Sequence, residues 1–82
     1  MPVLVPHASL AALLGEDTVR SAATTVGELL DEIERRISTD DWRWASRATI
    51  LVNGRNVHML RGRQTRLAPE DQVWMVLSGG GG

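Results

Sequence analysis

The spacing of apolar residues near the start of the chain predicts two short strands. Val3–Val5 is an apolar run, and Pro6 limits it because proline has no N–H to donate to a strand ladder. Residues 18–22 alternate between polar and apolar side chains, as a half-buried strand does. Residues 8–15 between them predict a loop or a single helical turn closed by Gly15. The two strands could therefore form a wide hairpin.

A change to helical spacing predicts one long amphipathic helix after Thr25. Thr25 is a favourable N-cap, and Glu28 three residues later completes a capping box. Apolar residues then recur on a single helical face, namely Val26, Leu29, Leu30, Ile33 and Ile37. The charged residues between them fall on the solvated face, with acids early and arginines late as the helix dipole favours. The polar residues 38–47 predict a connector.

Strand-like patterns return in the second half of the chain. Three apolar segments predict strands, at residues 48–52, 57–60 and 73–77. Asn53-Gly54 predicts a tight turn because both residues tolerate a positive φ. Residues 61–63 predict a second turn. Residues 67–71 predict a third, in which Pro69 suits the first central position.

The predicted order β-β-α-β-β-β indicates an α+β fold of the β-grasp (ubiquitin-like) type, with one main helix packed on a mixed sheet. The first and last strands should lie side by side, which the rules for right-handed crossovers permit. We expect one domain over residues 1–77 and a flexible glycine tail over residues 78–82. The predicted core comprises Val3, Val5, Val19, Val26, Leu29, Leu30, Ile33, Ile37, Ile50, Val52, Leu67, Val73, Met75 and Leu77.

Composition narrows the class of protein. The 82 residues are 43% hydrophobic and 23% charged, which is typical of a globular domain. A net charge of -1 gives no basis for binding nucleic acid or an anionic membrane. The absence of cysteine excludes disulfides, a thiol nucleophile and thiolate metal sites. Without a long apolar run or a secretory signal, we expect a cytoplasmic protein. All nine basic residues are arginine, so no side-chain amine could be acylated.

The chain ends in an unusual run, Ser78-Gly79-Gly80-Gly81-Gly82, directly after the last predicted strand. Glycine has no side chain and wide backbone freedom. Such a tail could carry the terminal carboxylate into a channel too narrow for other residues, where a second protein would act on it. The alternative is a flexible linker, since Gly/Ser runs are common spacers.

Trp74 is a candidate interface residue. If Val73 and Met75 point inward, Trp74 and Val76 lie on the other face of the sheet. Tryptophan is enriched among the residues that dominate binding energy at interfaces. We expect Leu51 and Leu4 to extend this partner interface. The alternative is that a tryptophan of the connector, either Trp42 or Trp44, covers Trp74.

Other polar residues give weaker indications of chemistry. His7 and His58 lack a carboxylate at ligand spacing, so we predict no metal site. Asp40-Asp41 is better explained by helix capping or solvation than by acid–base catalysis. The basic residues Arg61, Arg63 and Arg66 could steer an acidic partner, although a solvated loop also accounts for them.

Four features occur in a fixed order along almost the whole chain. They are Thr25-Val26-Gly27-Glu28-Leu29-Leu30, Val52-Asn53-Gly54, Leu67-x-x-x-Asp71-x-Val73 and the terminal Gly81-Gly82. Together they resemble the MoaD/ThiS family of ubiquitin-like sulfur carrier proteins. The long segment between helix and third strand resembles the molybdopterin-synthase small subunit and the cysteine-forming carriers most closely. Glu70, where the family often has glycine, and the Ser-Gly-Gly before the diglycine depart from the pattern.

This resemblance implies a protein substrate and not an enzyme. An E1-like adenylating enzyme would use ATP and Mg to activate the carboxylate of Gly82, and a sulfur donor would displace AMP to leave a thiocarboxylate. The sulfur would then pass to a sulfur-accepting synthase. Gly81 would give clearance beside the reacting group, and Ser78, Gly79 and Gly80 would thread the tail. The chain itself would bind no cofactor and no metal.

Two other functions are open at this point. The chain could be a ubiquitin-like protein modifier that is conjugated through Gly82 to lysines of other proteins. It could also be a non-catalytic β-grasp interaction module with an incidental flexible end.

Overall fold

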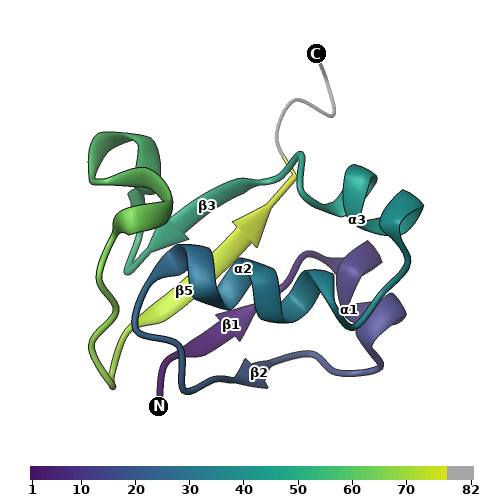
Figure 1. Cartoon of the computed structure of the whole chain (residues 1–82), viewed down its shortest axis with the longest axis horizontal. Coiled ribbons are helices and arrows are strands. Elements are labelled where there is room, and N and C mark those ends of the chain that lie inside the picture. Colours follow the sequence, from purple (N-terminus) through teal and green to yellow (C-terminus); the bar gives the residue numbers. More distant parts are fainter. Residues whose placement is uncertain (78–82) are drawn as a thin grey trace.

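The computed structural model describes residues 1–77, which form a mixed sheet with helices on one face and at one end (Figure 1). The strands are β1 Val3–Val5, β2 Val19–Arg20, β3 Thr49–Val52, β4 Arg55–Asn56 and β5 Gln72–Val76. The α-helices are α1 Ala8–Leu14, α2 Val26–Glu34 and α3 Thr39–Ala45. Two short 3-10 helices follow β4, η1 Val57–Met59 and η2 Gly62–Gln64. The predicted tail, residues 78–82, lies outside the described residues.

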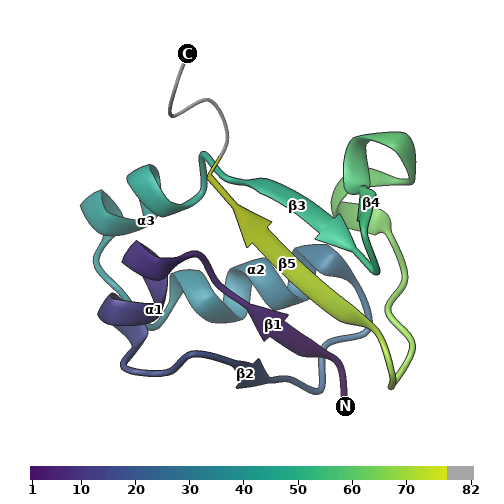
Figure 2. The same ribbon diagram turned by 180° about the vertical axis from the view of Figure 1, so that it is seen from behind.

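The five strands are ordered β2-β1-β5-β3-β4. β1 is parallel to β5, and the other neighbouring strands are antiparallel. The first and last strands are therefore adjacent, and α2 crosses one face of the sheet while the opposite face carries no helix (Figure 2). This arrangement confirms the predicted α+β, β-grasp fold. β5 occupies the centre of the sheet, between β1 and β3.

The start of α2 confirms the predicted N-cap and adds a detail. The Thr25 hydroxyl oxygen accepts a hydrogen bond from the Glu28 N–H at 3.1 Å. The Glu28 carboxylate accepts from the Thr24 N–H at 2.7 Å and the Thr24 hydroxyl at 2.8 Å, so the capping box closes one residue earlier than expected. The backbone hydrogen bond from Thr24 is the main cause that lowers the pKa of Glu28.

Most of the predicted core is buried between α2 and the sheet. The confirmed positions are Val19, Val26, Leu29, Leu30, Ile33, Val52, Leu67, Val73 and Met75. Ile37 and Ile50 are partly buried and pack against this cluster. Four buried hydrophobic residues were not predicted, namely Leu4, Leu10, Ala45 and Val57. The core therefore extends from α2 to the inner sides of α1 and α3.

The prediction that Val3 and Val5 of β1 belong to the core is wrong. Leu4 is fully buried, whereas Val3 and Val5 are only half-buried. Leu4 pairs with the buried Val73 in parallel register, so it points toward α2. All three residues of this Val-Leu-Val strand are apolar, so the sequence does not indicate which side chains face the core. Leu77 was also predicted to be buried but is 52% exposed, because β5 ends one residue earlier.

Three element predictions need correction. Residues 8–14 form a regular helix, ended by Gly15 at a φ of 74°. The connector contains α3, whose N-cap is Ser38; its hydroxyl accepts from the Asp41 N–H at 3.1 Å. The segment 57–60 is not a strand, because the Asn56 side chain accepts from the His58 N–H at 2.9 Å and caps η1.

Two predicted turns are joined by side chains. Asn53 and Gly54 have φ values of 51° and 86°, which confirms the tight turn between β3 and β4. The Asn53 amide donates to the Asp71 carboxylate at 2.8 Å and accepts from the Gln72 N–H at 2.9 Å. Asp71 also accepts from the Ala68 N–H at 2.7 Å, closing the turn around Pro69. These contacts align β3 with β5.

Candidate functional site

The face of the sheet opposite α2 exposes an apolar patch. Trp74 and Val76 are 43% and 41% exposed, since their neighbours Val73 and Met75 point into the core. Val5 and Leu51 stand opposite Trp74 on the two adjoining strands and are half-buried. We call Val5, Leu51, Trp74 and Val76 the outer patch. Leu4 does not extend it, contrary to the prediction, because Leu4 points to the other face.

The connector tryptophans do not account for the environment of Trp74. Trp42 packs against the hydrophobic core, and Trp44 is 70% exposed on α3, where it lines a groove with α1. The Trp74 indole N–H donates to the Gln72 side-chain oxygen at 3.3 Å, within the same strand. Trp74 thus keeps an accessible ring on the most central strand of the sheet.

The predicted reacting residues follow the end of β5. Leu77 is the last described residue, and Ser78, Gly79, Gly80, Gly81 and Gly82 lie beyond it. Because β5 pairs with strands on both sides and buries Val73 and Met75, its end is a firmly held base for whatever follows. α1 and α3 lie near this end of the sheet (Figures 1 and 2).

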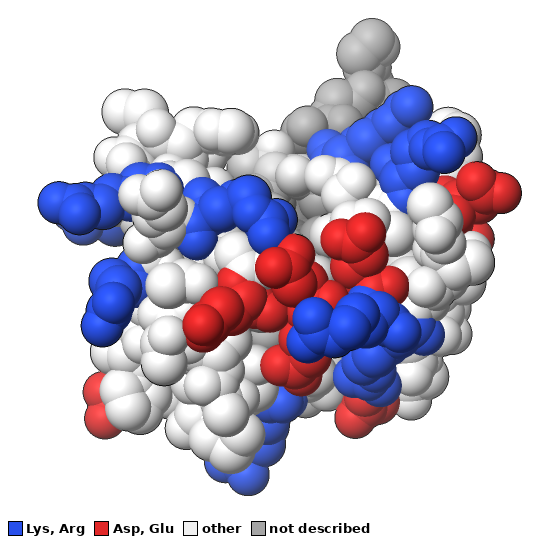
Figure 3. All heavy atoms as spheres, viewed as in Figure 1, with Lys and Arg blue, Asp and Glu red and all other residues white. Residues whose placement is uncertain are grey.

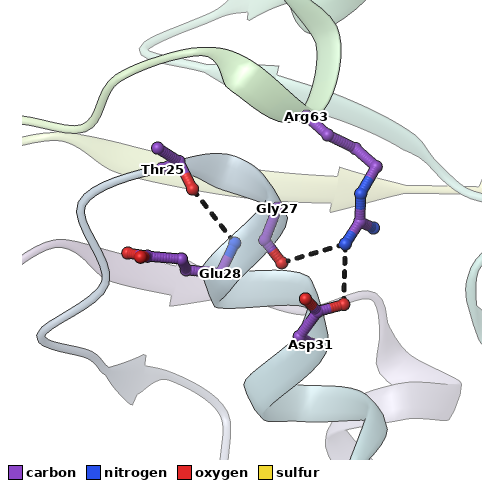
Figure 4. Close-up of polar contacts among 5 residues, drawn as sticks. All are labelled: Thr25, Gly27, Glu28, Asp31 and Arg63. Carbon is purple, nitrogen blue, oxygen red and sulfur yellow. Dashed lines mark hydrogen bonds and ion pairs between the residues drawn. The ribbon is translucent and has the colours of Figure 1, made fainter.

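Among the three arginines after β4, one makes side-chain hydrogen bonds within the fold. An Arg63 guanidinium nitrogen donates to the Gly27 carbonyl at 3.3 Å and to the Asp31 carboxylate at 2.6 Å, which ties η2 to α2 (Figure 4). Arg61 and Arg66 are exposed. On the face that carries α2, acidic and basic side chains are interspersed (Figure 3). Arg63 is therefore a structural anchor, and a strongly basic steering surface does not form on this face.

The histidines and the aspartate pair have structural positions. The His7 imidazole caps α1 by accepting from the Leu10 N–H at 3.2 Å. His58 is exposed on η1. Asp40 and Asp41 lie in the first turn of α3, consistent with the predicted capping role. Among residues 1–77, no group of three or more potential ligands could hold a metal ion.

Within residues 1–77, no helix has both the length and the apolar character needed to cross a bilayer.

A mixed sheet of order β2-β1-β5-β3-β4 with α2 across one face (Figure 2) defines a protein of the β-grasp, ubiquitin-like fold. The sequence matches the ThiS family model over residues 7–82, and the chain belongs to that family. This finding confirms the resemblance noted from the sequence. It establishes the broad class, a sulfur carrier or ubiquitin-like modifier, whose members are generally non-catalytic. No curated protein matches the sequence.

Solved structures share the fold over nearly their full length. One chain of the crystal structure of the Amycolatopsis orientalis BexX/CysO complex has a TM-score of 0.81 and 21% identity, with 100% of both chains covered. The solution structure of small archaeal modifier protein 1 (SAMP1) from Methanosarcina acetivorans has a TM-score of 0.73 and 20% identity, covering 96% of this chain and 95% of that one. The Haloferax volcanii HVO 2177 protein has a TM-score of 0.72 and 26% identity, covering 99% and 85%.

Proposed function

We propose that this chain is a sulfur carrier whose Gly82 carboxylate is adenylated by an E1-like enzyme and converted to a thiocarboxylate. The observation that carries the proposal is the family match, which extends through the terminal glycines. The fold supports it, since β5 provides a fixed base from which the glycine run begins. The thiocarboxylate would donate its sulfur to a biosynthetic enzyme.

The chemistry needs an activating partner because a carboxylate is a poor acyl donor. A carboxylate oxygen of Gly82 attacks the α-phosphorus of ATP, and Mg-bound pyrophosphate leaves. The resulting acyl adenylate has AMP as a good leaving group. Hydrosulfide supplied by the sulfur donor then attacks the acyl carbon and AMP leaves, and loss of the S–H proton gives the thiocarboxylate. This chain contributes the reacting carboxylate, and the adenylating enzyme contributes the nucleotide, the metal ion and the acid–base groups.

The composition of the tail suits that reaction. Five residues from Ser78 to Gly82 span at most about 16–18 Å when extended, which sets the depth of channel that the carboxylate can enter. Gly81 has no Cβ, so a narrow channel can close around it next to the reacting group. Ser78, Gly79 and Gly80 provide the remaining reach.

The outer patch is the proposed docking face for the partner enzymes. Its apolar centre on the sheet consists of the exposed Trp74 and Val76 and the half-buried Leu51. Exposed clusters of this kind commonly mark protein interfaces. A structural neighbour is part of a complex, named BexX/CysO, which accords with function through assembly with a second protein.

The test is ATP–pyrophosphate exchange with the cognate adenylating enzyme. Deletion of Gly82 should abolish exchange, because a shift of one residue, about 3.5 Å, removes the carboxylate from in-line geometry. Gly81→Val should act similarly by adding bulk and restricting the backbone. His58→Ala and Asp40→Ala are matched controls that should keep wild-type exchange. Exchange at the wild-type rate by the deletion variant would contradict the proposal.

A protein modifier is the second candidate. A structural neighbour is named a small archaeal modifier protein, although at 20% identity that likeness concerns the fold. Both functions share the adenylate and differ in the nucleophile, which is sulfur for a carrier and a lysine amine of another protein for a modifier. Conjugates of the chain recovered from cells would favour the modifier, and a free thiocarboxylate would favour the carrier.

A further inference from the structure

A second exposed apolar surface lies at the end of the sheet, in a groove of about 350 Å³ between α1 and α3. Leu13 on α1, Trp44 on α3 and Leu77 after β5 line it and are 47%, 70% and 52% exposed. We call this the end groove. It is separate from the outer patch, whose residues lie on the sheet face away from α2. Single exposed apolar residues are common on protein surfaces, whereas three large ones in one groove form a contiguous apolar surface.

The walls of the end groove are held in place by specific contacts. The second ring nitrogen of His7, Nε2, lies 3.3 Å from the Ala45 carbonyl at the end of α3. Since His7 also caps α1, this one side chain links the two helices. The Arg47 guanidinium lies 4.7 Å from the centre of the Trp44 ring, a cation–π contact that positions the ring at the rim. The groove is thus built before any partner arrives.

We propose that the end groove receives an apolar side chain of the adenylating enzyme, next to the channel that takes the glycine tail. The proposal rests on the proposed function. Leu77 lines the groove and directly precedes Ser78, so groove and tail begin at the same residue. An enzyme that holds the Gly82 carboxylate can be at most about 16–18 Å from Leu77. Its surface therefore comes close to Leu77, which is one of the residues that line the groove.

The residues around the end groove indicate which kind of surface on the adenylating enzyme would fit it. Leu13, Trp44 and Leu77 make the lining largely apolar, while Asp41 in the lining and Arg47 beside the Trp44 ring carry opposite charges. These charges favour neither sign in a partner, so the enzyme should present one large apolar side chain. The end groove and the outer patch would then be two separate contacts with the same enzyme.

The experiment compares three exposed apolar positions by ATP–pyrophosphate exchange. Leu13→Ser and Trp44→Ala should each raise the KM for the carrier by about tenfold or more, the effect typical of a central interface residue. Their kcat should stay unchanged, because the tail chemistry is intact. Trp44→Phe should restore much of the affinity. Met59→Ser is the matched control, since Met59 is 83% exposed on η1 and lines no part of the groove.

A competition experiment distinguishes binding through the end groove from the reaction of the glycine tail. The chain lacking Gly82 should inhibit exchange by the wild-type carrier, and Trp44→Ala in that chain should weaken the inhibition by a similar factor. Unchanged KM and unchanged inhibition, with wild-type exchange intact, would overturn this proposal and leave the sulfur-carrier function standing. Concentration-dependent dimers lost in Trp44→Ala would overturn it in favour of a second copy as occupant. A wild-type chain that supports no exchange would overturn both proposals.

Discussion

Replacing Gly27 by alanine should destabilise the fold, although helix propensity alone favours alanine. Gly27 is the second residue of α2, and alanine stabilises a helix interior by about 1 kcal/mol relative to glycine. The surroundings oppose this gain. A Cβ at position 27 would lie 3.1 Å from the Arg63 carbonyl oxygen and 3.3 Å from the Arg63 Cβ. Figure 4 shows the Arg63 guanidinium in contact with the Gly27 carbonyl and the Asp31 carboxylate at the start of α2.

The steric cost should exceed the gain because the neighbouring backbone cannot easily retreat. The Val26 N–H donates to the Thr65 carbonyl at 3.0 Å, and the Arg63–Asp31 ion pair at 2.6 Å holds the same segment. Overpacking a tight site costs about 1–3 kcal/mol. After the propensity gain of about 1 kcal/mol is subtracted, we expect a net loss of up to about 2 kcal/mol. A loss of about 2 kcal/mol would lower the Tm of a domain of this size by about 8–16 °C.

Urea unfolding followed by far-UV circular dichroism measures this effect. The midpoint should fall while the slope m is unchanged, which indicates an altered free energy of unfolding and not an altered unfolded state. Glu34→Ala, an exposed change on the same helix, is the control and should stay within about 0.5 kcal/mol of the wild type. A Gly27→Ala variant more stable than the wild type would refute the packing of η2 against α2.

Further predictions concern the two faces of β5 and the N-cap of α2. Met75→Ala should lose about 2–5 kcal/mol, because Met75 is 2% exposed and a cavity would remain. Trp74→Ala should cost less stability and mainly reduce affinity for the adenylating enzyme; thermal melts and titrations showing the reverse order would contradict the assigned faces. Glu28 has a lowered pKa, so its stabilising effect is present above the usual glutamate pKa of about 4.3 and is lost as the pH falls through the lower folded value. In Glu28→Gln, the free energy of unfolding should therefore fall less steeply as the pH is lowered. An unchanged fall would argue against the hydrogen bonds between Thr24 and Glu28.

The sequence predicted the elements whose signals are local. The α2 helix follows from Thr25, Glu28 and the apolar stripe, and each of these depends on residues within a few positions. The turn at Asn53-Gly54 follows from the need for a positive φ, which the structure has at both residues. In strand β5 the inward direction of Met75 and the outward direction of Trp74 were both predicted correctly, and these directions follow from the two-residue period of a strand.

The features that were missed depend on tertiary contacts. His7 is an uncommon N-cap, and its contact with Ala45 joins residues far apart in the chain, so α1 was predicted only as a loop or a turn. The signal for α3 was present as Ser38 followed by Asp41, a capping pattern hidden by the polar composition around it. Leu4 could be placed only by its register with Val73.

The same difference between local signals and tertiary contacts applies to the candidate site. The sequence was sufficient to predict that Trp74 and Val76 share a face, because strand alternation is local. It could not predict that Leu13, Trp44 and Leu77 line one groove, since three separate segments supply them. The roles of Gly81 and Gly82 lie beyond the described residues and depend on the family relationship and on the chemistry of a terminal carboxylate.

The central claim is that the Gly82 carboxylate becomes a thiocarboxylate. The most direct measurement is mass spectrometry of the intact chain and of its C-terminal fragment, after incubation with the adenylating enzyme, ATP and a sulfur donor. The account predicts a mass gain equal to the replacement of one oxygen by sulfur, confined to the fragment that ends in Gly82 and dependent on ATP. A chain that is adenylated but gains no sulfur, and is instead recovered joined to lysines of other proteins, would contradict the claim.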